Sequence, residues 1–156
     1  FLSELVEPEC LRICLEVAEG QLVVAMVEAD SSQQALWSLS RNPLPARLWR
    51  RLSGFCFQRL YPSLCEVCRR PTEPPPPLRT ELAGAYEAPG CRSCVGVTRA
   101  SGVFEFANAL PEGWWECPNP TSLRDKLQAA GLKSLHSDWL SKVARGIVPP
   151  KNPPPH

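Results

Sequence analysis

The sequence predicts a mixed fold rich in β-structure, with short helices, built around a ribbon of four cysteines. Two Cys-x-x-Cys pairs, Cys65/Cys68 and Cys91/Cys94, stand 22 residues apart. The segments that flank them alternate apolar and polar residues, as strands do. Two stretches nearer the C-terminal end repeat their apolar residues at helical spacing. These observations predict strands around a metal-binding centre, followed by helices.

The four cysteines predict a structural zinc site. A two-residue spacer directs two sulfurs to one ion, and two such pairs complete a tetrahedral shell for Zn²⁺. The spacing between the pairs is slightly longer than usual, and the insert Pro74–Pro77 accounts for the excess. Two local disulfides or buried free thiols remain alternatives. A four-sulfur shell has no open position, so we expect the metal to stabilise the fold and not to activate water.

Length and composition predict one domain. The chain has 156 residues, 44% of them hydrophobic, which is enough for one core. We expect residues 1–148 to form a single domain with its ribbon at 64–96. We expect 149–156 to be a proline-rich linker or tail, and the chain to be a piece of a longer protein.

Cysteine usage and the N-terminal residues predict a reducing compartment. A chain with this apolar content does not need disulfides to fold, so a reducing compartment, cytosol or nucleus, fits best. With the DNA-binding interpretation below, we expect the nucleus. The N-terminal residues include Glu4 and Glu7, whereas a signal peptide has a basic region followed by an apolar one. No apolar run approaches the roughly 20 residues that cross a bilayer, so no membrane partner is expected.

The first 62 residues predict a hairpin, two helices and a strand. Residues 10–28 show loose apolar alternation on both sides of Gly20, which favours a β-hairpin over a helix at 10–18. Cys10 and Cys14 would then be core thiols. A helix is expected at 33–40, capped within 30–32, and another at about 45–53. The strand at 55–62 would bury Cys56.

The residues after the ribbon predict a hairpin, a loop and two helices. The hairpin spans 95–110 and turns at Ala100–Gly102. The loop carries Trp114-Trp115, which we expect to form a hydrophobic plug under the ribbon, with an exposed docking site as the alternative. The helices run from Thr121 or Ser122 to Gly131, and over about 134–145. His136 on the last helix is expected to face solvent.

An uneven charge distribution suggests a nucleic-acid surface. Residues 31–70 contain seven arginines and one glutamate, although the whole chain has a net charge of +1. Guanidinium groups pair with phosphates, and interleaved aromatic rings stack on bases. A protein contact or a solvated face is the alternative. The candidate residues are Arg41, Arg47, Trp49, Arg50, Arg51, Phe57, Arg59, Arg69 and Arg70.

Catalysis finds no support in the sequence. The chain lacks a GxSxG motif, an HExxH motif, a P-loop and the His-x-Glu of zinc deaminases. We therefore expect neither an enzyme nor a small-molecule substrate.

The order of elements resembles a known family. The stretches RLYPSLCEVC and PGCRSCVGV, with their strand-rich flanks, resemble the zinc-ribbon OB-folds of eukaryotic single-stranded-DNA-binding proteins. These include the C-terminal DNA-binding domain of the replication protein A large subunit and related shieldin and telomere-capping domains. The resemblance implies an OB-like β-barrel with C-terminal helices, with DNA across a basic, aromatic groove. It also implies contact with partner subunits through the C-terminal helix.

Two functions follow from these observations. The first is a non-catalytic, zinc-stabilised module of a DNA repair complex that binds single-stranded DNA. The second is a protein-interaction scaffold, in which the ribbon and a helix stripe dock a partner subunit. The ribbon of a transcription or ubiquitin-pathway factor stays open as a third. The stripe consists of Leu135, Trp139 and Val143.

Overall fold

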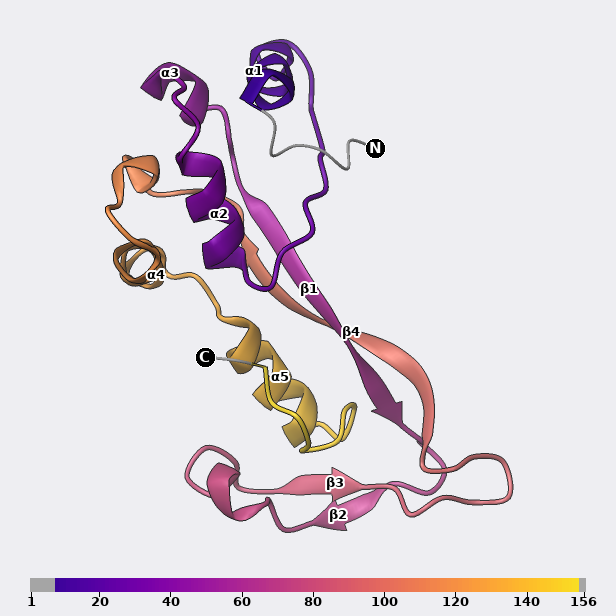
Figure 1. Ribbon diagram of the computed structural model, residues 1–156. Helices are drawn as coiled ribbons and strands as arrows, with labels where there is room; N and C mark the ends of the chain where they lie inside the picture. The colour runs from indigo at the N-terminus through magenta and orange to yellow at the C-terminus, as the bar shows by residue number, and fades with distance from the viewer. Residues whose placement is uncertain (1–7, 155–156) are drawn as a thin grey trace. The chain divides into compact units, whose positions relative to one another are not determined.

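The computed structural model describes residues 8–154 (Figure 1). The expectations about a signal peptide and about the last two residues of the tail fall outside this range. No helix within it is both long and apolar enough to cross a membrane. The elements in chain order are α1 Pro8–Val17, α2 Ser32–Ser40, α3 Ala46–Trp49, β1 Phe55–Leu64, β2 Arg70–Thr72, the 3₁₀ turn η1 Pro76–Leu78, β3 Ala85–Glu87, β4 Val97–Ala107, the 3₁₀ turn η2 Trp114–Glu116, α4 Pro120–Ala129 and α5 Leu135–Ala144.

The mixed fold with short helices is confirmed, but the described strands do not close a barrel. They form two separate sheets of two strands each, β1 with β4 and β2 with β3. The β2–β3 pair is antiparallel, with Arg70 opposite Glu87 and Thr72 opposite Ala85. Five helices accompany these sheets.

The chain folds as two compact units, each with its own core. The first contains the chain through Cys56 together with Phe106–Leu132. The second contains Phe57–Glu105 and the chain from Lys133 onward. That residues 1–148 act as one folding domain stays a prediction.

The expected hairpin at 10–28 is wrong, because its first half is the helix α1. Leu11 and Leu15 lie one turn apart on the helix and are both buried in the core of the first unit. On another face, Arg12 pairs with Glu9 at 2.5 Å and with Glu16 at 2.8 Å. Such pairs at i, i+3 and i, i+4 stabilise a helix and have no equivalent in a strand. The local contacts therefore favour the helix.

The helices α2, α3 and α4 supply most of the first core. Ser31 caps α2, because its hydroxyl accepts the N–H of Gln34 at 3.2 Å. The cap of α4 is Asn119, earlier than the expected Thr121 or Ser122, and Pro120 follows at the first helical position. An asparagine before a proline suits a helix start well. The expected helix at 45–53 is shorter and ends at Trp49.

The tryptophan pair is buried in a core, as expected, but this core belongs to the first unit, whereas the ribbon belongs to the second. Trp114 and Trp115 are both buried in the first core. The Trp114 ring meets Trp49 edge to face, with ring centroids 5.4 Å apart. This arrangement suits the quadrupoles of two indole rings.

In the second unit, α5 lies against β3 and shares a core with η1 and β4. Its core includes Trp139, Val103 and Leu78. The run Pro74–Pro77 therefore packs against the second unit, since Pro74 is buried and the run leads directly into the buried Leu78. His136, expected in solvent, is only 8% exposed, and its Nε2 lies 3.0 Å from a carboxylate oxygen of Glu81.

The strand β1 is confirmed, whereas the hairpin expected at 95–110 is one continuous strand, β4. No turn forms at Ala100–Gly102, where the ring of Phe104 covers Gly102 so closely that a Cβ there would meet it at 2.5 Å. Gly102 therefore provides space for the Phe104 ring and does not form a turn. Cys56, expected to be buried, is exposed because it points to the open side of β1.

Candidate metal centre

The four cysteines of the ribbon converge on one point. The sulfurs of Cys65, Cys68, Cys91 and Cys94 all lie within 4.8 Å of one another. Cys65 is buried and the other three are half-buried. No other group of His, Cys, Asp or Glu in residues 8–154 meets the same criterion. The ligand set expected from the sequence is therefore confirmed as a cluster that could hold a metal ion.

The distances between the sulfurs suit coordination better than disulfide bonding. Cys91 Sγ lies 3.5 Å from Cys94 Sγ, and Cys68 Sγ lies 3.6 Å from Cys94 Sγ. A disulfide joins its sulfurs at about 2.05 Å. Zn–S bonds of about 2.3 Å in a tetrahedron place sulfurs about 3.8 Å apart. All eight cysteines are free, so the cluster retains four thiol ligands.

Two glycines with left-handed backbone shape the second knuckle. Gly90 has φ of 103° and Gly96 has φ of 100°, a region that residues with a Cβ rarely adopt. A Cβ on Gly96 would also lie 2.4 Å from the carbonyl oxygen of Ala88. Between them, Cys91 and Cys94 exchange two backbone hydrogen bonds of 3.1 Å each. The turn therefore holds both sulfurs on one side.

Hydrogen bonds within the cluster prepare it for a cation. The backbone N–H of Gly96 and the neighbouring thiols of the cluster donate to Cys94, which lowers the pKa of Cys94 to about 6. Burial, followed by the hydrogen bond with Cys94, raises the pKa of Cys68 to about 12. One thiolate therefore forms easily, and further thiolates are opposed by burial and proximity. A divalent cation removes that opposition by neutralising several thiolates together.

Two neighbouring arginines support the ribbon within the second unit. Arg69, next to the first knuckle, donates to the carbonyl oxygen of Gly146 at 2.9 Å, just past the end of α5. Arg70 pairs with Glu87 at 2.7 Å, directly across the β2–β3 sheet. Both are members of the expected nucleic-acid surface, which stays a prediction. Their observed contacts support the ribbon.

Arg50 and Arg41 of the first unit also have partners within the protein. Arg50 pairs with Glu112 at 2.8 Å, and the guanidinium of Arg41 lies 5.1 Å from the centre of the Trp37 ring. Arg47 lies exposed on α3. In the second unit, Arg59 is half-buried on β1.

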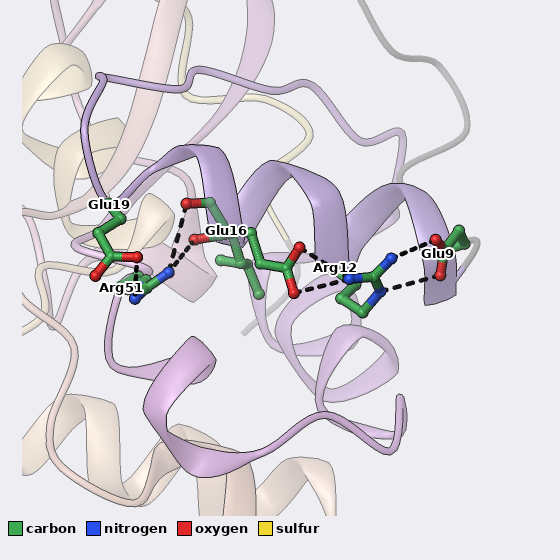
Figure 2. Close-up of polar contacts among 6 residues, drawn as sticks. Glu9, Arg12, Glu16, Glu19 and Arg51 are labelled. Carbon is green, nitrogen blue, oxygen red and sulfur yellow. Dashed lines mark hydrogen bonds and ion pairs between the residues drawn. The ribbon is translucent and has the colours of Figure 1, made fainter.

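Arg51 closes the C-terminal end of α1 (Figure 2). It donates to the carbonyl oxygens of Leu15 at 3.2 Å and Glu16 at 3.4 Å, and pairs with Glu19 at 2.9 Å. Carbonyls of a last helical turn lack partners within the helix, and a cation there suits the helix dipole. Sequence reasoning missed this role, because it had placed α1 in a strand.

The two aromatic members of the expected nucleic-acid surface differ in their exposure. Trp49 is only 2% exposed and belongs to the first core. Phe57 is half-buried against the second core. The expected base-stacking role of Trp49 is therefore wrong, since its ring already packs against Trp114.

The expected partner-binding stripe on the last helix is also a core feature. Leu135, Trp139 and Val143 are buried within the second unit. The helical spacing was read correctly, but the face contacts the protein's own strands and leaves no surface for a partner. Docking through this stripe is therefore wrong.

Comparison with known proteins gives one distant relative and no family. No family model matches the chain. The chain is similar to the type IV pilus assembly ATPase PilB of Thermus thermophilus, with 27% identity over 169 aligned positions. The match covers 95% of this chain and 18% of that protein. The chain thus corresponds to less than a fifth of the relative's length.

Proposed function

We propose that this chain is a non-catalytic, zinc-stabilised structural module of a larger protein related to type IV pilus assembly ATPases. The observation that carries the proposal is the convergence of four cysteine sulfurs within 4.8 Å. Four thiolates at tetrahedral spacing are the ligands of closed structural zinc sites. Zn²⁺ bound there would join the two knuckles and hold the β2–β3 sheet in register.

The distant similarity supports a place within a larger assembly. It extends over nearly the whole chain, so both units correspond to one continuous part of the relative. The chain has no P-loop, so nucleotide hydrolysis would belong to other parts of such a protein. Within it, this module serves architecture and protein contacts.

Single-stranded DNA binding by an OB-like domain in the nucleus stays a prediction, with less support than the scaffold. Ion pairs engage Arg50, Arg51 and Arg70, and Trp49 lies in a core. Exposed ion pairs are weak individually, but a binding surface would need several of them to open together. The distant similarity supports a part in pilus assembly, and no comparison supports DNA repair.

An oligonucleotide titration separates the two functions. Fluorescence anisotropy of a labelled oligo-dT is measured with the zinc-loaded chain at about 50 and 200 mM salt, the range over which phosphate contacts weaken binding steeply. The scaffold predicts no saturable binding at either salt concentration. Tight binding with a steep salt slope, reduced by Arg47→Gln and Arg59→Gln, would contradict it. ATP turnover by the isolated chain would contradict the non-catalytic assignment.

A further inference from the structure

The segment between α1 and α2 is apolar but forms neither a helix nor a strand. Residues 22–29 carry the sequence LVVAMVEA and run as drawn-out coil from one helix to the next (Figure 1). Leu22, Val24 and Met26 are 92%, 82% and 59% exposed. These alternate positions share one side of an extended chain. Such a row of exposed apolar side chains is unusual for a soluble surface.

Within the described part of the chain, the backbone of this segment also lacks backbone partners. Among residues 8–154, no backbone hydrogen bond joins Gln21 through Ala29 to another residue. A run rich in β-branched residues has high strand propensity, and its free N–H and C=O groups form a template for another strand. The second half of the expected hairpin is therefore also wrong, since no strand forms at 22–29.

One end of the segment is fixed on the first unit. Val27 packs against the first core, and an open hollow of about 340 Å³ separates the segment from α2. Glu28 and Asp30 line this hollow, together with Gln34 and Ser38. The segment is thus held at one end, with polar and acidic groups beside its free backbone.

The charges around the segment indicate which kind of strand could pair with it. Glu28 lies in the hollow beside the segment, whereas the earlier acids Glu16 and Glu19 already pair with Arg12 and Arg51. Between Arg12 and Arg41 the chain contains no lysine or arginine. The same segment of a second copy therefore brings no cation to Glu28. A second copy is therefore disfavoured, and a strand with basic flanks is favoured.

We propose that residues 22–29 receive a β-strand from another polypeptide, an apolar strand with lysine or arginine on its flanks. Backbone hydrogen bonds would give affinity, and the row Leu22, Val24 and Met26 would contact alternate apolar side chains of the incoming strand. Its basic flank would lie against Glu28. This surface deepens the proposed scaffold function, but it does not depend on the metal and can fail independently.

Peptide probes test the proposal with the zinc-loaded full chain. The first probe is an acetylated, amidated peptide of alternating valine and threonine with two lysines at each end. A second probe has glutamates in place of the lysines, and a third has a proline at its centre. Binding is followed by fluorescence anisotropy, and hydrogen exchange locates the protected amides. We expect saturable binding of the first probe, with slowed exchange confined to residues 22–29.

Two pairs of variants make the test specific. Val24→Pro and Ala25→Pro each remove an unpaired N–H, on opposite edges of the extended segment. Both should leave thermal stability unchanged, and at least one should abolish binding. Glu28→Lys should weaken the binding of the lysine probe about two- to fivefold, the size of effect expected for one exposed charge pair. The same substitution should strengthen the binding of the glutamate probe. Asp125→Lys makes the same change of charge on α4 and should leave the affinities of both probes unchanged.

Several results would overturn the proposal. Exchange at 22–29 that is already slow in the free monomer would mean that the strand has a partner within the chain. Concentration-dependent self-association that protects the segment would identify a second copy as the occupant. Equal binding of the lysine and glutamate probes, or no binding of either, would exclude a basic strand.

Discussion

Gly96 donates its backbone N–H to the sulfur of Cys94 at 3.3 Å and accepts, through its carbonyl oxygen, the N–H of Cys65 at 3.0 Å. One residue thus contacts a ligand from each Cys-x-x-Cys pair. Its φ of 100° is required for both contacts, because it turns the chain back at the end of the second knuckle. The metal centre therefore depends on backbone geometry as well as on its sulfurs.

Gly96→Ala should destabilise the second unit by about 1–3 kcal/mol, the range for a residue with a Cβ forced into left-handed backbone. The added Cβ would also meet the carbonyl of Ala88 at 2.4 Å, which adds to the strain. Chemical denaturation measures the change. Gly84→Ala is the matched control, because nothing lies within 4 Å of its added Cβ. Equal stabilities for the two variants would contradict the role of Gly96.

Cys91→Ser should lower the thermal midpoint of the chain and make it insensitive to a chelator, because three remaining thiolates bind zinc far less tightly. The wild-type chain should lose a similar amount of stability when the chelator is added. Circular dichroism during heating follows both. Cys56→Ser is the control, since this exposed cysteine lies outside the cluster. A Cys56→Ser variant that also loses its chelator response would contradict the assignment of ligands.

Arg51→Gln should lower the free energy of unfolding by about 1–2 kcal/mol, because it removes a charged hydrogen-bond donor from the end of α1. Arg47→Gln, on the same short helix but exposed, should change it by less than about 0.5 kcal/mol. Urea denaturation compares the two. A double-mutant cycle with Glu19→Gln then isolates the ion pair. Equal effects of the two arginine substitutions would mean that Arg51 does not brace the helix.

Trp139→Ala should destabilise the second unit by about 3–5 kcal/mol, as expected for removing a buried tryptophan. Ser141→Ala, on the exposed face of the same helix, should be close to neutral. Thermal denaturation distinguishes the two. If Trp139→Ala folds with wild-type stability, the stripe is a surface and not a core.

The features that were predictable from the sequence are those encoded by short spacings. The Cys-x-x-Cys pairs fix their own local turns, so the ligand cluster followed from the sequence alone. The helices α2, α4 and α5 also followed, because their apolar positions recur at helical spacing and their starts have caps. Local geometry is sufficient in each of these cases.

The features that were missed depend on contacts between distant residues. The segment 10–28 has strand propensity, but the Leu11/Leu15 pair and the bonds from Arg51 favour a helix in its first half. The arginines were read as a free basic patch, because their acidic partners are distant in sequence, as with Arg50 and Glu112. The stripe on α5 looked like a docking face because its covering strands could not be placed from sequence.

Native mass spectrometry of the purified chain, with and without a strong chelator, tests the zinc-stabilised module most directly. We predict one zinc ion per chain, lost on chelation together with the folded charge-state distribution. Four free thiols should become available to alkylation at the same time, at Cys65, Cys68, Cys91 and Cys94. A metal-free chain that is nevertheless folded, or mass deficits that reveal disulfides between these cysteines, would contradict the account.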